Sequence, residues 1–256
     1  IDDQLFCGHN NGAYIIKGYH AEKISNIPGA WIFLKPEKSL DLVIGGTYTC
    51  LTLFRKENGK WTFSKRIAGF DESSRVMQID KDKSLWISHD SKGVYRLTFN
   101  NTYDSISNIR FYNTDKGFKS NYGINVSKLQ GEIIFLSPHG IFRYDESTDN
   151  MVPAERYNSL FANKIIDKVI ENKNGDIWYF SENQLAVKRR QEDGSFKEIS
   201  HPFKPLEGSF IGKFEFVSDQ SDGQVFIGSE NGFIHYDPKF NTNYDKPFHV
   251  FINHIK

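Results

Sequence analysis

The sequence predicts an all-β protein built from one repeated unit, and three observations support this. Aromatic residues make up 15% of the 256 residues, with 22 Phe and 12 Tyr, and strands favour such side chains. Methionine occurs only twice, and no segment combines a helical period with a capping box and a closing glycine. A phrase of apolar run, polar bend and alternating aromatic strand, usually with a glycine after the bend, recurs along the chain.

The recurring phrase sets the size of the unit. LWISHDSKGVYRL and VFIGSENGFIHYD are clear copies, whereas LVIGGTYTCLTLF and IWYFSENQLAVKR are looser ones. Successive copies lie about 44 residues apart, and a period of 40–50 residues built of short strands is typical of a propeller blade. The six copies begin at Leu5, Leu42, Leu85, Ile133, Ile177 and Val225.

Each unit can be laid out as a four-stranded antiparallel blade. In the third unit the predicted strands are Arg75–Asp80, Leu85–Ser88, Gly93–Phe99 and Ile109–Tyr112. The second strands read LWI, IIFL, IWYF and VFI, which are apolar on both faces, so each blade must be covered by neighbours. We therefore expect a β-propeller with four full blades flanked by two partial ones. Because the chain starts abruptly at a second strand, we expect a longer parent protein with seven or more blades.

Bulk properties exclude several classes of function. The formal net charge is zero, so we expect no general binding of nucleic acid or of an anionic membrane. Apolar runs reach only about five residues, whereas a transmembrane helix needs about 20. We expect no signal peptide, because Ile1, Asp2 and Asp3 lead directly into a strand-like run. Cys7 and Cys50 are too few for a disulfide framework, and the sequence leaves their pairing open.

The pair His89–Asp90 lies in a polar bend and could be read as catalytic. Ser88, His89 and Asp90 are consecutive, so they cannot form a nucleophilic triad among themselves. Equivalent bends carry other polar residues, which favours a turn. The stretch Asp80–Ser84 imitates the start of a calcium loop but lacks its glycine and glutamate, so we interpret it as a hairpin turn. We expect no catalytic residues.

Histidines from equivalent bends could share one rim of the ring. His9, His89 and His139 occupy such bends, but no histidines are spaced at i, i+2 or i, i+4 as in common metal sites. No phosphate-binding loop occurs either. We therefore expect no metal and no cofactor.

Topology places the polar bends and the long connections between blades on one face. If the first strand of a blade runs downward, the bend between strands two and three and the connection to the next blade are both at the top. Variable loops on a rigid frame are where recognition occurs. The candidate ligand-binding residues on this top face are His9, Asn10, Trp31, Tyr48, Arg75, His89, Asp90, Asn121, Tyr122, His139, Asn163, Glu182 and Glu230.

Aromatic rings beside amides, histidines and carboxylates suit a neutral polyhydroxylated ligand, although ordinary packing of aromatic loops is an alternative. A second alternative is a propeller enzyme, a lyase or glycosidase acting on glycans, which would need two carboxylates about 5–10 Å apart. Glu182 and Glu230 are the candidates for that pair. A third is a protein-interaction scaffold, which would present a broad apolar patch.

The blade phrase, together with SRVMQIDKDKS before it and the connection KGFKSN after it, resembles the two-component-regulator propeller repeat. GHNNGAYIIKG, ISNIPGAW and GTYTCLTLFRKENGKW resemble the variant found in Bacteroidetes regulators. The resemblance covers nearly the whole chain. The sequence departs from the family pattern in two respects. The usual Gly-Thr after the second strand is only loosely kept, and units two and five lack the bend glycine.

The resemblance implies a non-catalytic, extracytoplasmic sensor region of an inner-membrane regulator, placed in the periplasm. Output would pass to a histidine kinase or to a LuxR-type DNA-binding segment outside this region, and the ligand would be a small molecule or an oligosaccharide. Residues 1–240 are then propeller blades. The tail KPFHVFINHIK, within residues 241–256, resembles the start of a triple-tyrosine immunoglobulin-like domain. That downstream domain and a second copy of the parent, forming a homodimer, are the expected partners.

Overall fold

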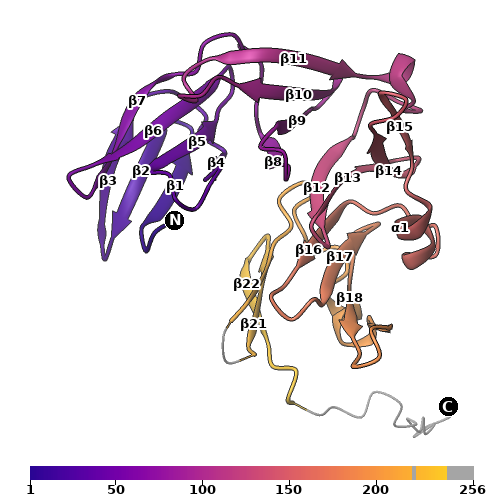
Figure 1. Cartoon of the computed structure of the whole chain (residues 1–256). Helices are drawn as coiled ribbons and strands as arrows, with labels where there is room; N and C mark the ends of the chain where they lie inside the picture. Colours follow the sequence, from indigo (N-terminus) through magenta and orange to yellow (C-terminus); the bar gives the residue numbers. More distant parts are fainter. Residues whose placement is uncertain (221–222, 241–256) are drawn as a thin grey trace, which may run out of the picture. The chain divides into compact units, whose positions relative to one another are not determined.

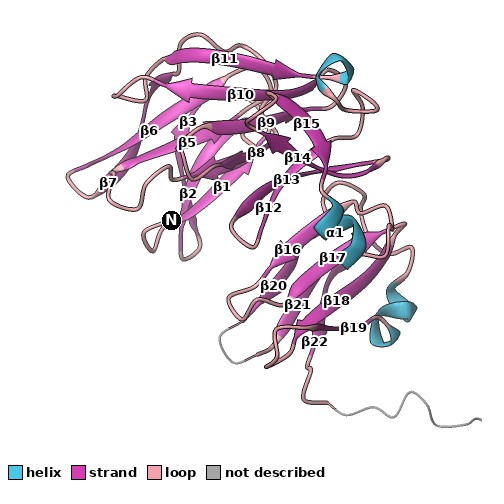
Figure 2. Cartoon of the chain, turned by 45° about the vertical axis from the view of Figure 1, so that its right-hand side comes forward, coloured by secondary structure: helices cyan, strands magenta, loops and turns pink. Residues whose placement is uncertain are grey.

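A computed structural model describes residues 1–220 and 223–240, and it is built almost entirely of strands. The chain divides into two compact units, Ile1–Ile166 and Asp167–Lys256. Each unit is a row of small antiparallel sheets in which neighbouring strands follow one another along the chain (Figures 1 and 2). The prediction of an all-β protein is confirmed.

The first unit contains four sheets, here called blades 1 to 4, and only blade 1 has three strands instead of four. The strands of blades 1 and 2 are β1 (Leu5–His9), β2 (Gly12–Lys17), β3 (His20–Ser25), β4 (Ile32–Leu34), β5 (Leu42–Gly46), β6 (Leu51–Glu57) and β7 (Lys60–Arg66). The strands of blades 3 and 4 are β8 (Val76–Ile79), β9 (Leu85–His89), β10 (Gly93–Phe99), β11 (Ile106–Tyr112), β12 (Asn125–Leu129), β13 (Glu132–Ser137), β14 (Gly140–Asp145) and β15 (Asn150–Pro153).

The second unit contains blades 5 and 6, with four and three described strands. These are β16 (Lys168–Glu171), β17 (Ile177–Ser181), β18 (Gln184–Arg190), β19 (Phe196–Ile199), β20 (Val217–Asp219), β21 (Val225–Ser229) and β22 (Gly232–Tyr236). The predicted pattern of four full blades flanked by two partial ones is therefore confirmed, and blade 1 starts at the second strand of the repeat. The predicted tail domain, residues 241–256, lies outside the described residues.

Burial explains why the second strand of each repeat is the most apolar. All five residues of β5 are buried, as are four of five in β9 and in β17. The outer strands β7 and β11 are mostly exposed. Blades 2 and 3 thus bury their inner strands between neighbours and present their outer strands to solvent, which is the burial pattern expected of stacked blades.

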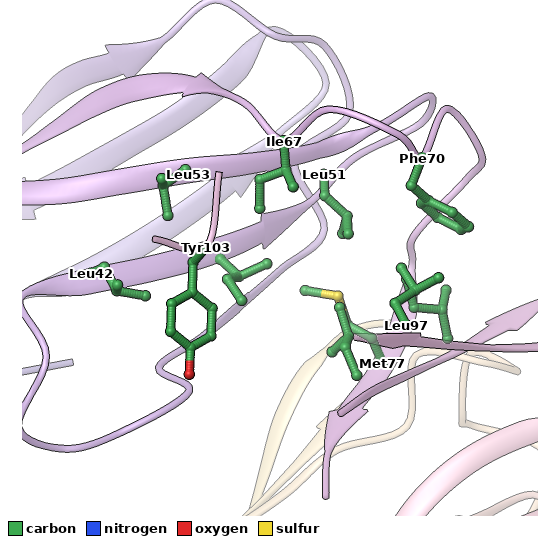
Figure 3. Packing of buried hydrophobic residues seen from close by; sticks show 11 residues of the cluster. Leu42, Leu51, Leu53, Ile67, Phe70, Met77, Leu97 and Tyr103 are labelled. Atoms are coloured by element: carbon green, nitrogen blue, oxygen red, sulfur yellow. The ribbon is translucent and has the colours of Figure 1, made fainter. Parts of the chain in front are cut away.

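Along a second strand, successive side chains point alternately toward the two blades on either side. Figure 3 shows the core between blades 2 and 3, where Leu42 and Leu53 lie on one side and Met77 and Leu97 on the other. Ile44 also belongs to this core, whereas Val43 packs in the opposite direction, against blade 1. Successive strand residues point to opposite faces, so a single second strand serves both of its neighbours.

The structure shifts the start of the repeat in blade 2 by one residue from the position that the sequence predicts. A Cβ on Gly8 would lie 2.3 Å from the carbonyl oxygen of Ala30, and one on Gly46 would lie 1.9 Å from that of Ser74. These two glycines therefore occupy the same place, where a second strand meets the connection of the next blade. It follows that Val43, not Leu42, is equivalent to Leu5. The two consecutive glycines of LVIGG conceal this shift in the sequence.

Short helices interrupt three of the connections between blades, where the sequence predicts loops. They are the 3₁₀ helices η1 (Thr114–Lys116) and η2 (His201–Leu206), and the α-helix α1 (Glu155–Leu160). None exceeds six residues, which is too short for a helical period to be recognised in the sequence. No helix in the described part of the chain has the length and apolar character needed to cross a bilayer.

Candidate ligand-binding surface

The top face of the first unit is formed as the topology predicts, by bends meeting connections. The backbone N–H of Ala30 donates to the carbonyl of His9 (3.2 Å), and that of Ser74 donates to the carbonyl of Thr47 (2.9 Å). Between blades 3 and 4 a side chain makes the corresponding link, because Ser88 Oγ accepts the N–H of Val126 at 2.8 Å. The bends of blades 1 and 2 are thus fixed to the connection of the next blade, and the end of β9 is fixed to β12.

His89 is the last residue of β9 and forms the start of a turn. Its Nδ1 accepts the N–H of Ser91 at 3.3 Å, and His9 makes the same contact with the N–H of Asn11 at 3.1 Å in blade 1. The two histidines therefore cap equivalent bends. This geometry agrees with the turn interpretation of His89–Asp90.

Four predicted residues from three blades gather at one place, and we call them the rim cluster: Asn10, Trp31, Tyr48 and Arg75. The Tyr48 hydroxyl donates to Asn10 Oδ1 at 2.7 Å. The Trp31 and Tyr48 rings meet edge to face, with centroids 5.3 Å apart. The Arg75 guanidinium lies 5.1 Å from the centroid of the Trp31 ring. Two aromatic rings, an amide and a cation therefore form one continuous surface.

Gly29 makes room for the Tyr48 ring. Its φ is +70°, and a Cβ there would lie 2.1 Å from Tyr48 Cδ2. The ring thus rests directly on the backbone of the connection between blades 1 and 2. Tyr48 is nevertheless 41% exposed, so part of its face remains open to solvent.

A charged group lies in the same connection as Arg75. Glu72 accepts a hydrogen bond from Lys92 Nζ at 2.6 Å, and its other oxygen lies 3.6 Å from His89 Nε2. The hydrogen bond from Lys92 holds the pKa of the Glu72 carboxyl below its usual value. Glu72 is therefore a carboxylate at neutral pH and holds the His89 ring against the connection.

Other predicted residues of the first unit are used within their own loops. Asn121 Oδ1 accepts the N–H of Thr114 at 2.9 Å. The N–H of His139 donates to Ser137 Oγ, and Asn163 has a φ of 57° in a tight turn. Tyr122 is 65% exposed. Asn121 and the backbone of His139 thus form hydrogen bonds within their own loops.

Glu182 and Glu230 lie in the second unit, at the two equivalent bends predicted for them. The N–H of Glu182 donates to Asp167 Oδ2, and that of Glu230 donates to the carbonyl of Ser209, each at 3.0 Å. Both residues are exposed. The catalytic acid of a glycosidase usually lies in a buried pocket, and these two glutamates lie on exposed bends.

Metal and thiol chemistry have little support in the described residues. They contain no group of three or more His, Cys, Asp or Glu side chains arranged to hold a metal ion. Cys7 and Cys50 are both free thiols. Cys50 is buried at the bend of blade 2, where its carbonyl accepts the hydroxyl of Thr47 at 2.7 Å. The calcium-like stretch is a turn whose Asp82 pairs with Arg96.

Sequence reasoning missed Glu72, Lys92 and Gly29. Glu72 and Lys92 lie in polar stretches that give no periodic signal, and only the folded connection brings them together. Gly29 follows a proline, which indicates a turn, but nothing in the sequence shows that an aromatic ring covers it.

Several solved structures of other proteins align with this chain. The extracellular domain described as that of the Bacteroides thetaiotaomicron hybrid two-component system BT3049 aligns with a TM-score of 0.62 at 18% identity, covering 96% of this chain and 33% of that one. The corresponding domain of BT4673 from the same organism aligns with a TM-score of 0.63 at 14% identity, covering 93% and 31%. The WD40 β-propeller domain of Doa1 aligns with a TM-score of 0.55 at 12% identity, covering 91% of this chain and 74% of that one.

The chain has a β-propeller fold. At these identities the likeness establishes the fold alone. The chain spans about a third of the length of the two sensor domains. No family model and no curated protein matches the sequence.

Proposed function

We propose that this chain is the ligand-sensing propeller region of a membrane-bound signalling regulator, and that its ligand is an oligosaccharide. The observation that carries the proposal is the rim cluster, where Trp31 and Tyr48 present ring surfaces beside the Asn10 amide and the Arg75 cation. Fold-level likeness to extracellular domains of hybrid two-component systems supports the sensory role by analogy.

The chemistry of the rim cluster suits a sugar ring. An aromatic face packs against the apolar C–H face of a sugar, while amide and guanidinium groups donate to or accept from its hydroxyls. The cluster spans three consecutive blades, so a ligand there would contact several rigid elements at once. Glu72 adds a carboxylate in the same connection as Arg75, and its partners His89 and Lys92 add polar groups from the bend of blade 3.

The remaining parts of the proposal follow the sequence resemblance. The region works in the periplasm, without catalysis, metal or cofactor. Ligand binding changes the packing of the propeller on the following immunoglobulin-like domain, and thereby the geometry of a homodimer. Output passes to a histidine kinase or a LuxR-type segment. The complete propeller has more than six blades.

The test is a thermal-shift screen of this chain against a panel of defined oligosaccharides. A ligand that binds only the folded state raises the melting temperature by mass action. For a glycan that gives such a shift, Trp31→Ala and Tyr48→Ala should each weaken binding at least tenfold by titration calorimetry, because each removes a ring face. Tyr48→Phe should weaken it less, since only the hydroxyl bonded to Asn10 is lost.

The matched control is Tyr19→Ala, which removes a fully exposed tyrosine from a turn between β2 and β3. Its affinity should equal that of the unmodified chain. A panel without any shift would contradict the oligosaccharide assignment. A glycan that binds equally well to Trp31→Ala and Tyr48→Ala would show that the rim cluster is not the site.

A further inference from the structure

Arg75 is the charged member of the rim cluster, and it is held by its flat face. It directly precedes β8, at the end of the connection from blade 2 to blade 3, and its guanidinium lies 5.1 Å from the centroid of the Trp31 ring. Trp31 is itself fixed, because its backbone N–H donates to the carbonyl of Gly46 at 2.9 Å and its ring meets that of Tyr48. A guanidinium carries five N–H donors in one plane, and stacking uses its face and none of these donors.

The neutral members of the rim cluster add donors beside Arg75. The Tyr48 hydroxyl donates its proton to Asn10 Oδ1 at 2.7 Å. That bond engages the amide oxygen of Asn10, whose NH2 group supplies two further donors. The surface therefore combines donors from Arg75 and Asn10 with the ring of Tyr48. Such a set favours a ligand group that is rich in acceptors.

Two acidic residues, Asp71 and Glu72, precede Arg75 in the same connection. Glu72 accepts a hydrogen bond from Lys92 Nζ at 2.6 Å, and its other oxygen lies 3.6 Å from His89 Nε2. The Glu72 carboxylate is thus paired with a cation from the bend of blade 3. Asp71 is exposed, so water screens its charge. Within the rim cluster itself, Arg75 supplies a positive charge beside three neutral side chains.

We propose that the oligosaccharide recognised at the rim cluster is acidic, and that the carboxylate of a uronic acid binds Arg75. This inference rests on the proposed function and narrows its ligand class. A carboxylate matches the fork of a guanidinium and accepts two parallel hydrogen bonds from it. The Trp31 ring contacts both the guanidinium and the Tyr48 ring, so a short oligosaccharide can place its carboxylate on Arg75 and a C–H face on Tyr48.

The test compares trisaccharides that differ in charge: the trimers of galacturonate and of glucuronate, each beside its methyl ester, in which a neutral ester replaces every carboxylate. Titration calorimetry with this chain should show that one of the acids binds about tenfold more tightly than its ester, the worth of one charge-assisted hydrogen bond. A higher NaCl concentration should weaken binding of the acid and leave that of the ester unchanged, because salt screens an ion pair at the surface.

Variants of Arg75 assign the preference to its guanidinium. Arg75→Gln should remove the preference by weakening the acid alone, and Arg75→Lys should recover only part of it, because an ammonium keeps the charge without the fork. The matched control is Arg143→Gln, which changes an exposed arginine of β14 whose Nη1 donates to the carbonyl of Tyr144 at 3.5 Å. Both affinities should be the same in this control as in the unmodified chain.

Equal binding of acid and ester, with both lost in Trp31→Ala and Tyr48→Ala, would overturn the acidic ligand and leave the proposed function standing. So would a screen in which only neutral or only sulfated glycans bind. A preference for the acid that survives Arg75→Gln would overturn the role of Arg75. If no glycan of any kind binds, the proposed function itself fails, and this inference fails with it.

Discussion

Asp149 shows how one residue can join two blades. It precedes β15 in blade 4, and its Oδ1 accepts the hydroxyl of Tyr112 from blade 3 at 2.8 Å and that of Tyr144 from its own blade at 3.0 Å. Lys116 Nζ donates to Oδ2 at 2.9 Å. The hydrogen bond from Lys116 is the largest cause that holds the pKa of Asp149 far below its usual value, and the tyrosine hydroxyls add to it.

We expect Asp149→Asn to lower the free energy of unfolding by about 1 kcal/mol at neutral pH, the usual worth of a hydrogen-bonded charge that is partly exposed. The pKa of this group is lower in the folded than in the unfolded protein, so its contribution exists above the unfolded pKa, about 3.9, and is lost as pH falls. Urea unfolding of the unmodified chain and of Asp149→Asn at pH 7 and pH 3 measures the difference in the free energy of unfolding.

The control for that variant is Asp145→Asn in the same hairpin. Asp145 accepts the hydroxyls of Ser147 and Thr148 within the turn and joins no second blade through them, so its loss should matter less at pH 7. A difference between the unmodified chain and Asp149→Asn that is as large at pH 3 as at pH 7 would contradict the assigned role.

At the scale of the element, the seams that follow blades 1 and 2 depend on close backbone contact at the end of the second strand. Gly46 has no Cβ and so allows the Ser74 carbonyl to approach, and Gly8 does the same for Ala30. Blade 3 has Ser88 at this place, whose hydroxyl bonds to the neighbouring strand instead. Blades 1 and 2 thus have no side chain at this place, whereas blade 3 has a small one that forms a hydrogen bond.

We expect Gly46→Ala to destabilise the chain by about 1–3 kcal/mol, because the new methyl group must displace backbone at the seam. Gly212→Ala is the control, since nothing lies within 4 Å of a Cβ there and its φ is ordinary. Thermal unfolding of both variants measures the effect. Equal melting temperatures for the two variants would show that the contact at Gly46 accommodates a methyl group without loss of stability.

Sequence alone predicts most elements but not their fine register. The apolar second strands and the glycine turns are strong local signals, and the structure confirms their positions. The register of blade 2 is not predicted, because consecutive glycines allow two alignments that differ by one residue. Helix α1 is missed because six residues carry no recognisable period.

At the scale of the whole molecule, the repeat predicts which residues share a face but not which of them touch. Asn10, Trp31, Tyr48 and Arg75 come from three blades, and their contacts depend on loop conformations such as the positive φ of Gly29. His139 and Asn163 occupy equally polar positions, but the backbone N–H of His139 bonds within its own bend and Asn163 has a positive φ. Tertiary packing, which no local signal encodes, makes this distinction.

The central claim is that short β-units are stable because each buries its inner strands against copies of itself. Hydrogen exchange followed by mass spectrometry tests this most directly, since protection reports local stability. Amides of β5 and β9 should exchange slowest within the first unit, and those of β7 and β11 much faster. Equal protection of inner and outer strands, or exchange of β5 and β9 at the rate of an unfolded peptide, would contradict the claim.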